Sequence, residues 1–318
     1  MLKYFVVRVL SLIPMLIIIS AVIFFALELT PGNPLTRMIS PDAIANLSPA
    51  ELEQMMEAYG LNDPAIIRYF RWAGGILVGD MGVSLISGQP VNGILSNLVP
   101  ATLQLAFAAL IISTILGLVL GILSAIKQNS WIDYACSVFG VIGVSFPEFF
   151  VGICFMMFFS IKLGWFPVQG RTDIGLGWFA SLKYMILPAL ALGFALTAAL
   201  TRYTRGSMLD VLNKDYVKTA RAKGLPEWKV YFKHAFRNAL MPISVLLCLR
   251  LPMLIGGSVV IETVFGYSGV GKKLVEAING KDYPVVMMIT MIMTVVTLLA
   301  SVLIDLLTAV LDPRVRLD

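Results

Sequence analysis

Long stretches without a charged residue alternate with short polar segments along the whole chain. A helix needs about 20 apolar residues to cross the hydrocarbon core of a membrane, and six stretches reach or approach that length. They lie at about 9–29, 101–126, 134–161, 185–201, 241–262 and 283–309. Lys183 and Arg202 bound the shortest of them. Gly117 and Gly121 lie four residues apart in the second, a spacing that permits close helix approach. The pattern predicts six transmembrane helices.

The composition excludes a water-soluble protein. Of the 318 residues, 58% are hydrophobic and 14% are charged, and the mean hydropathy is +0.86. In soluble domains, about 45–50% of the residues are apolar and about 25% are charged. The three cysteines lie far apart in apolar stretches and show neither a disulfide framework nor metal-ligand spacing. We therefore expect an all-α integral membrane fold that itself binds no metal and no cofactor.

The distribution of Lys and Arg orients the helices. These residues are much denser in the segments 1–8, 127–133, 202–240 and 310–318 than in the alternate segments. Basic residues concentrate on the cytoplasmic side, so we expect a multi-pass protein of the cytoplasmic (inner) membrane with both termini in the cytoplasm. The net charge of +5 follows from this bias and does not indicate nucleic-acid binding. The first stretch is too long for a signal-peptide core and lacks a cleavage site, which predicts an uncleaved helix.

These features divide the chain into three parts. Residues 1–29 form the N-terminus and first helix, 30–100 an extracytoplasmic cap segment, and 101–318 a five-helix core with a cytoplasmic loop at 202–241. Within the cap segment, Ser48 to Glu51 reads as a capping box. Asp63-Pro64 opens a second helix. Its predicted apolar stripe is Ile66, Tyr69, Phe70 and Ala73. The cap segment is either a lid that stabilises the helices or a docking site for a delivery protein.

The loop at 202–241 contains two predicted helical pieces around Gly224-Leu225-Pro226. The first has a narrow face of small residues, which would let another surface approach closely. That face comprises Val217, Ala220 and Gly224. The second piece is amphipathic, with its apolar face at Trp228, Tyr231, Phe232, Ala235, Phe236 and Ala239. Periodicity leaves two interpretations open: a helix held on the membrane surface by anionic lipid, or an element that transmits force to a soluble partner.

Residues 215–225 resemble the EAA loop of the permeases of binding-protein-dependent ABC transporters, and 234–242 follow at the expected distance. Other stretches resemble the dipeptide, oligopeptide and nickel branch of that family, in particular its first permease subunit. They are Pro31 to Leu35, Gly256 to Phe265 with Gly269 to Gly271, and Leu311 to Arg316. One departure is Lys218, which stands where the general motif has an acid.

The resemblance implies a mechanism. This chain and a second homologous permease subunit would form a heterodimeric pathway through the membrane lipid. Two cytosolic ATPase subunits, which bind ATP and Mg²⁺, would associate beneath it, and an extracytoplasmic binding protein would deliver the cargo. Residues 215–226 would be the coupling helix. Its partner-contacting residues would be Asp215, Tyr216, Val217, Thr219, Ala220, Arg221, Ala222, Lys223, Gly224 and Leu225.

The chain itself is not expected to be an enzyme, and we assign it no catalytic residue. Residues 266–273 nearly match the phosphate-binding pattern GxxxxGK[ST], but Lys273 occupies the position of the Mg²⁺-binding hydroxyl. The motif also needs a preceding strand, and none is predicted there.

Glu148 and Arg250 are the most deeply placed charges of the predicted helices. Charged side chains within a membrane usually face a cavity or a partner. Phe146-Pro147 predicts a break beside Glu148. The two side chains either pair with each other or line a translocation pathway and bind the termini of a substrate. Glu262 and Asp305, which lie near the ends of helices, are expected to be structural.

The leading interpretation is a permease subunit that imports small peptides. A variant with the same architecture would import nickel or a metal chelate. The only histidine, His234, lies in the basic loop, which disfavours binding of a bare metal ion. A secondary transporter would need coupling-ion carboxylates near the midplane and usually internal repeats. A membrane-bound enzyme would need polar residues clustered at one depth. The sequence shows neither arrangement.

Overall fold

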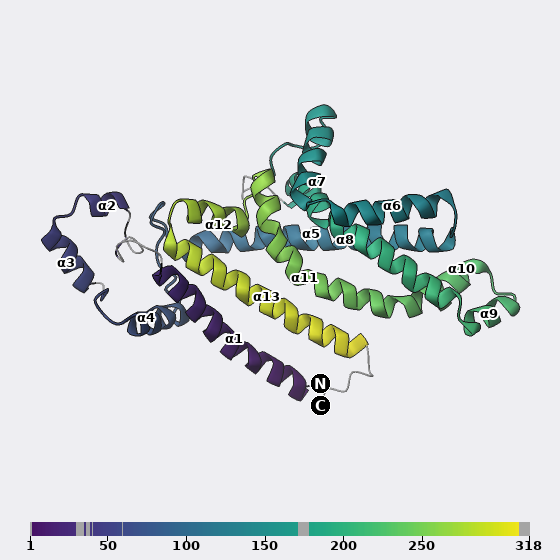
Figure 1. The fold of residues 1–318 in the computed structure, drawn as a ribbon, viewed down its shortest axis with the longest axis horizontal. Helices are drawn as coiled ribbons and strands as arrows, with labels where there is room; N and C mark the ends of the chain where they lie inside the picture. The colour runs from purple at the N-terminus through teal and green to yellow at the C-terminus, as the bar shows by residue number, and fades with distance from the viewer. Residues whose placement is uncertain are drawn as a thin grey trace. The chain divides into compact units, whose positions relative to one another are not determined.

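A computed structural model describes residues 2–29, 35, 39, 41–58, 60–170 and 178–311, and every regular element within these ranges is helical (Figure 1). The first half contains α1 (Leu2–Glu28), α2 (Pro41–Ala45), α3 (Pro49–Ala58), α4 (Ala65–Leu77), α5 (Val91–Ile126), α6 (Trp131–Ser145), α7 (Glu148–Phe155) and the π-helical η2 (Met156–Lys162). The second contains α8 (Trp178–Leu212), α9 (Asp215–Ala222), α10 (Glu227–Lys229), the π-helical η3 (Val230–Phe236), α11 (Arg237–Phe265), α12 (Val270–Asn279) and α13 (Tyr283–Leu311).

The predicted all-α membrane fold is confirmed. Five helices are long and apolar enough to cross a membrane, and the count is six if the bent pair formed by α6 and α7–η2 is one span. The two parts of this pair meet at 112°. The break lies at Phe146-Pro147, where the sequence predicted it, because proline disfavours a helical conformation in the residue before it.

Two helices extend well beyond the predicted spans. α5 begins at Val91 and includes Pro100, which was expected to precede it. α8 continues through Arg202 to Leu212. The predicted limit of α8 was wrong because a charged residue limits the part of a helix that suits hydrocarbon, but it does not end the helix itself. The predicted start of α5 was wrong because Pro100 and the polar residues before it lie within the helix.

The described chain forms two compact units, each considered by itself. Unit 1 comprises residues 1–101 and 268–299, and unit 2 comprises 102–267 and 300–318. The three-part division expected from the sequence stays a prediction. Of the motifs named above, 31–34 and 312–318 lie outside the described residues, as does the side chain of Asp305.

In unit 1, α4 packs against α1, and the start of α5 packs against α12 and α13. The second contact buries Val91 and Leu95 with Val285 and Ile289. The buried carboxylate of Asp282 accepts hydrogen bonds from the Ser84 hydroxyl (2.5 Å) and the Leu85 amide (3.0 Å). This contact fixes the turn before α5 onto the segment that leads into α13.

The cap segment contains the two helices that the sequence predicted. Ser48 and Glu51 form the capping box, in which the Ser48 amide donates to Glu51 Oε2 at 2.8 Å. The predicted stripe of α4 is only partly correct. Tyr69 is buried against α1, whereas Ile66 and Phe70 are exposed. The four residues span about 100° at 100° per residue, and α1 packs against only the edge of this arc that bears Tyr69, next to Trp72.

In unit 2, α6, α7 and α11 all pack on α8. α5 also approaches α8 closely, as the glycine spacing predicted. A Cβ atom added at Gly121 would lie 2.5 Å from the Cβ of Thr204 and 2.7 Å from the Thr201 carbonyl oxygen. A further link joins α5 to α11, where the Thr102 hydroxyl donates to the buried Glu262 at 2.6 Å. The interior position of Glu262 agrees with the structural role expected for it.

Candidate functional site

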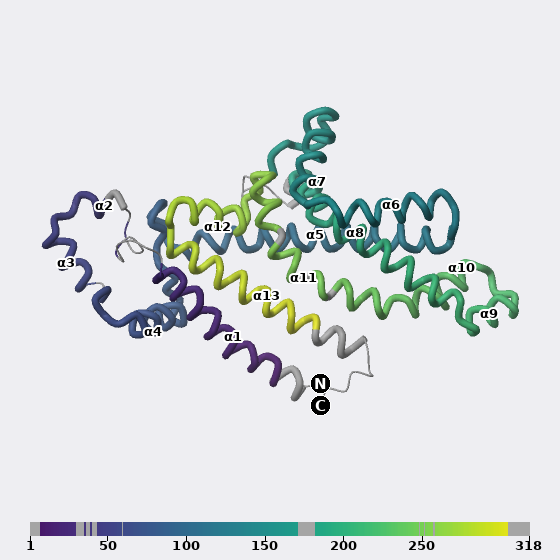
Figure 2. The backbone as a smooth tube through the Cα atoms, in the orientation of Figure 1, coloured from purple at the N-terminus to yellow at the C-terminus, as the bar shows by residue number. Residues whose placement is uncertain are grey.

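The predicted coupling segment folds as a compact turn between α8 and α11 (Figure 2). We call residues 213–229 the basic hairpin. α8 ends at Leu212, α9 follows from Asp215 to Ala222, and Gly224 then reverses the chain with φ of +73°. Side chains with a Cβ rarely adopt this left-handed conformation. The Leu225 amide donates to the Ala220 carbonyl at 3.4 Å and closes the turn.

Val217 and Ala220 form the buried side of α9. Together with Val230 they make a small core, against which Val211, Leu212 and Leu225 pack. The narrow face was predicted to admit another protein, and this part of the prediction was wrong. Because the adjoining ends of α8 and η3 already cover that face, Val217 and Ala220 instead hold the helix in place.

The opposite side of α9 is exposed, and it is charged and polar. Tyr216 is 46% exposed, and Lys218, Thr219, Ala222 and Lys223 are exposed beside it. Lys218 donates to Asp215 at 2.9 Å, and this hydrogen bond lowers the pKa of the Asp215 carboxyl. Lys218 therefore has an acidic neighbour one turn earlier in the helix.

A second ion pair joins the two sides of the basic hairpin. Arg221 Nε lies 3.0 Å from Glu227 Oε1, and its Nη2 lies 3.3 Å from Glu227 Oε2. The hydrogen bonds to Glu227 raise the pKa of Arg221 above its usual value. This pair spans the turn at Gly224 and joins its two sides, in addition to the small core around Val217.

The predicted apolar face of the second piece is only partly correct. Ala235 and Ala239 are buried as expected, whereas Trp228 and Phe232 are 62% and 53% exposed, and Val230, which lay outside the predicted face, is buried. The reason is the π-helical stretch η3, in which the backbone repeats with i→i+5 hydrogen bonds. Val230 and Ala235, five residues apart, therefore face the same side, a spacing that an α-helical period does not reveal.

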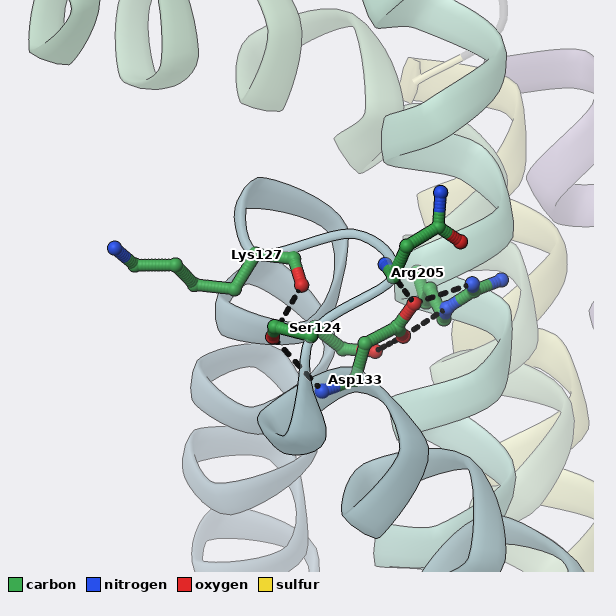
Figure 3. A network of polar contacts seen from close by, with 6 residues as sticks. Ser124, Lys127, Asp133 and Arg205 are labelled. Atoms are coloured by element: carbon green, nitrogen blue, oxygen red, sulfur yellow. Dashed lines mark hydrogen bonds and ion pairs between the residues drawn. The ribbon is translucent and has the colours of Figure 1, made fainter.

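A polar network fixes the same end of unit 2 and was missed from the sequence. Arg205 of α8 donates from Nε to Asp133 Oδ1 at 2.6 Å and from Nη2 to Oδ2 at 2.8 Å (Figure 3). Asp133 also accepts from the Ser124 hydroxyl at 2.5 Å and the Asn129 amide at 3.0 Å. The network joins α8 to the α5–α6 turn.

This turn lies at the same end of unit 2 as the basic hairpin. Ile122 and Ala125 of α5 share a core with Ala235 and Ala239, which follow the hairpin. Figure 1 shows both turns at that end. The sequence placed both on one side of the membrane, and the structure brings them together.

A cavity of about 590 Å³ lies elsewhere in unit 2 and is lined by both Glu148 and Arg250. Leu192, Leu196 and Leu254 supply apolar walls. Of the two alternatives, pairing of the two charges is wrong: among the described residues they form no ion pair, and the guanidinium of Arg250 lies 3.3 Å from the sulfur of Met253. The break at Pro147 positions Glu148 at the start of α7, on this cavity.

Comparison with known proteins identifies the family. The family described as "binding-protein-dependent transport system inner membrane component" matches residues 117–317, and the corresponding N-terminal family matches 1–106. The chain belongs to this family of inner-membrane transport components. It is therefore a multi-pass membrane permease of a binding-protein-dependent ABC importer, as the resemblance indicated.

Curated relatives of this permease cover the whole chain. The oligopeptide transport system permease protein AppB of Bacillus subtilis is 40% identical, over 99% of this chain and 100% of its own. The glutathione transport system permease protein GsiC of Salmonella paratyphi A is 35% identical over 99% of both chains. A solved structure of the MetNI methionine ABC transporter matches with a TM-score of 0.57 at 17% identity, covering 70% of this chain and 98% of that one. This last likeness supports the fold alone.

Proposed function

We propose that this permease imports small peptides as one of two related membrane subunits, with the basic hairpin seated on a cytosolic ATPase subunit. Its partners are a second permease subunit, two ATPase subunits that bind ATP and Mg²⁺, and an extracytoplasmic binding protein. The observation that carries the proposal is the exposed polar side of α9, which is held rigidly at one end of unit 2.

The residues of the basic hairpin divide into two roles. Val217, Ala220 and Leu225 anchor α9 to its own chain, and Gly224 provides the reversal. The exposed positions contact the ATPase subunit: Asp215, Tyr216, Thr219, Arg221, Ala222 and Lys223. A rigid element can transmit displacement in both directions. ATP shifts the equilibrium between outward-open and inward-open states only through its different affinity for the two states.

The proposed orientation places the basic hairpin and both termini in the cytoplasm. The hairpin and the α5–α6 turn share one end of unit 2. The hairpin is rich in Lys and Arg and the turn carries Lys127, in agreement with the positive-inside bias.

The energy source lies outside this chain in our proposal. The near-match to a phosphate-binding loop at 266–273 follows helix α11, which ends at Phe265, and leads into α12. A phosphate-binding loop of this type connects a strand to a helix. The local structure therefore favours ATP binding by the partner subunits.

The Glu148–Arg250 cavity is proposed to form part of the peptide pathway. Its volume of about 590 Å³ falls within the roughly 300–1,000 Å³ of small-molecule sites. A peptide with free ends carries one ammonium and one carboxylate, which complement Glu148 and Arg250. The printed names of the relatives, an oligopeptide permease and a glutathione permease, support peptide as the cargo. Import of nickel or a metal chelate stays the alternative.

The proposal is tested by replacing one exposed tyrosine in the hairpin and one outside it. Tyr216→Ala should reduce both cargo uptake and cargo-stimulated ATP hydrolysis by the reconstituted complex. Tyr134→Ala is the matched control, because Tyr134 is 63% exposed on α6. Uptake of labelled dipeptides and of ⁶³Ni²⁺ by the same vesicles distinguishes the two cargoes. Equal effects of the two tyrosine variants would refute the coupling role.

A further inference from the structure

The helix α4 carries an apolar stripe that its own chain leaves uncovered. Ile66, Phe70 and Leu77 are 52%, 66% and 88% exposed. At 100° per residue they share one side of the helix. This side differs from the one that bears Tyr69 and Trp72, whose rings contact Phe24 of α1. α4 is therefore apolar on a side that faces away from α1.

The contacts of α4 with α1 show the depth at which it lies. The hydroxyls of Tyr69 and Ser20 are 2.8 Å apart, and Tyr69 also donates to the Ile17 carbonyl at 3.3 Å. The uncharged stretch of α1 runs from Val9 to Leu27, which is 19 residues. At 1.5 Å per residue it measures about 28 Å, so nearly all of it is needed to cross a core of about 30 Å.

Ser20 consequently lies about 10 Å inside the boundary marked by Leu27. A tyrosine side chain is shorter than this depth, so the backbone of α4 cannot stand far above the membrane. Arg68 forms an ion pair with Glu28 at the end of the uncharged stretch. Tyr and Trp, both present on α4, are typical of the boundary between headgroups and acyl chains.

We propose that α4 is an interfacial helix, embedded in the lipid leaflet at the Glu28 end of α1. Its exposed stripe is covered by acyl chains. A helix of this type lies in the plane of the interface with its apolar side buried about 5–10 Å into the boundary region. Part of the cap segment is then a membrane anchor, which fixes the approach to α5 relative to the bilayer. The stripe is not a docking surface for the binding protein.

Spin labels on the full chain in vesicles of phosphatidylethanolamine and phosphatidylglycerol test this placement. The three native cysteines are replaced by alanine, and a nitroxide is attached at Phe70→Cys or, independently, at Leu77→Cys. Gln54→Cys on the exposed side of α3 is the aqueous reference, and Ile13→Cys on α1 is the lipid reference. The readout is collision of the label with oxygen, which dissolves in lipid, and with a water-soluble nickel chelate.

Both α4 labels should collide more with oxygen than with the chelate, as the Ile13 label in lipid does. The Gln54 label in water should show the opposite order. Greater collision with the chelate would place the stripe in water and overturn the proposal. Low collision with both reagents would show that protein covers the stripe, and would also overturn it.

Discussion

Arg205 and Asp133 form a bidentate ion pair that connects the C-terminal part of α8 to the first turn of α6, beside the turn between α5 and α6. Asp133 is almost fully buried, and two further donors complete its hydrogen bonds. The pair stands at the end of the unit that carries the basic hairpin. In the proposed mechanism, it keeps that end rigid while the ATPase subunit moves the hairpin.

Breaking this pair should destabilise the protein. Removing one partner of a buried ion pair costs about 3–5 kcal/mol, and the 29% exposure of the Arg205 side chain reduces the expected loss for Asp133→Asn to about 2–3 kcal/mol. A lower melting temperature in detergent would show it. Asp215→Asn, which removes a solvent-exposed pair with Lys218, should leave the melting temperature unchanged. Equal melting temperatures for both variants would contradict this assignment.

The close approach of α5 and α8 gives a second prediction. Gly121→Ala places a methyl group against Thr204 and the Thr201 carbonyl, and overpacking of this kind costs about 1–3 kcal/mol. Gly93→Ala, on the same helix, meets nothing within 4 Å. It should not destabilise the protein, because alanine favours helix more than glycine does. The comparison is made by thermal melting, and destabilisation by the Gly93 variant alone would be the contrary result.

A third prediction concerns the recognition of peptide termini. Arg250→Ala should weaken uptake of free peptides while assembly with the partners and basal ATP hydrolysis persist. Loss of a hydrogen bond to a charged group costs about 1.5–3 kcal/mol. This corresponds to roughly a 10- to 100-fold rise in the peptide concentration that half-saturates uptake. Arg250→Lys should retain most of the uptake.

Peptides with amidated carboxyl ends provide the matching control. In the unaltered protein, amidated peptides should inhibit uptake of a labelled free peptide only weakly. In the Arg250→Ala variant, they should inhibit it as strongly as free peptides do. If that variant fails to assemble at all, Arg250 has a structural role instead.

The capping box of α3 should make that helix sensitive to acid. Hydrogen bonds from the Ser48 hydroxyl and then its amide lower the pKa of Glu51. A lowered pKa means that the stabilisation is complete above the unfolded value of about 4.3 and disappears as the pH falls through the folded value. A spin label at Gln54 should therefore become more mobile in that acidic range. Glu51→Gln keeps a hydrogen-bonding side chain without titration and should remove the pH dependence. If the label mobility of this variant still depends on pH in the same way, titration of Glu51 is not the cause.

Features governed by local chemistry were predictable from the sequence. Pro147 breaks the third span, Ser48 and Glu51 cap α3, and Gly121 meets α8. The break and the cap depend on the conformation of one or two residues, and neighbouring elements do not alter the outcome. The small size of Gly121 predicted a close helix approach, although the sequence did not indicate that α8 would be the partner.

Features that depend on tertiary packing were predicted less well. The ion pair of Asp133 and Arg205 was missed because Arg205 was counted among the basic residues beyond a span. The signal that could have found it is the continuation of the helical pattern past Arg202. The π-helical η3 moved Trp228 and Phe232 to the exposed side, and no α-helical period shows such a change.

The most direct test of the proposed coupling role is photo-crosslinking from α9 in the assembled importer. Benzoylphenylalanine at the exposed Thr219 should crosslink to a cytosolic ATPase subunit, with a yield that changes between ATP-bound and ATP-free states. The same group at Gln54 of α3 should give no such product. If the Thr219 site yields no ATPase crosslink, and a cysteine there is labelled by membrane-impermeant maleimide added outside intact cells, the proposed coupling role is contradicted.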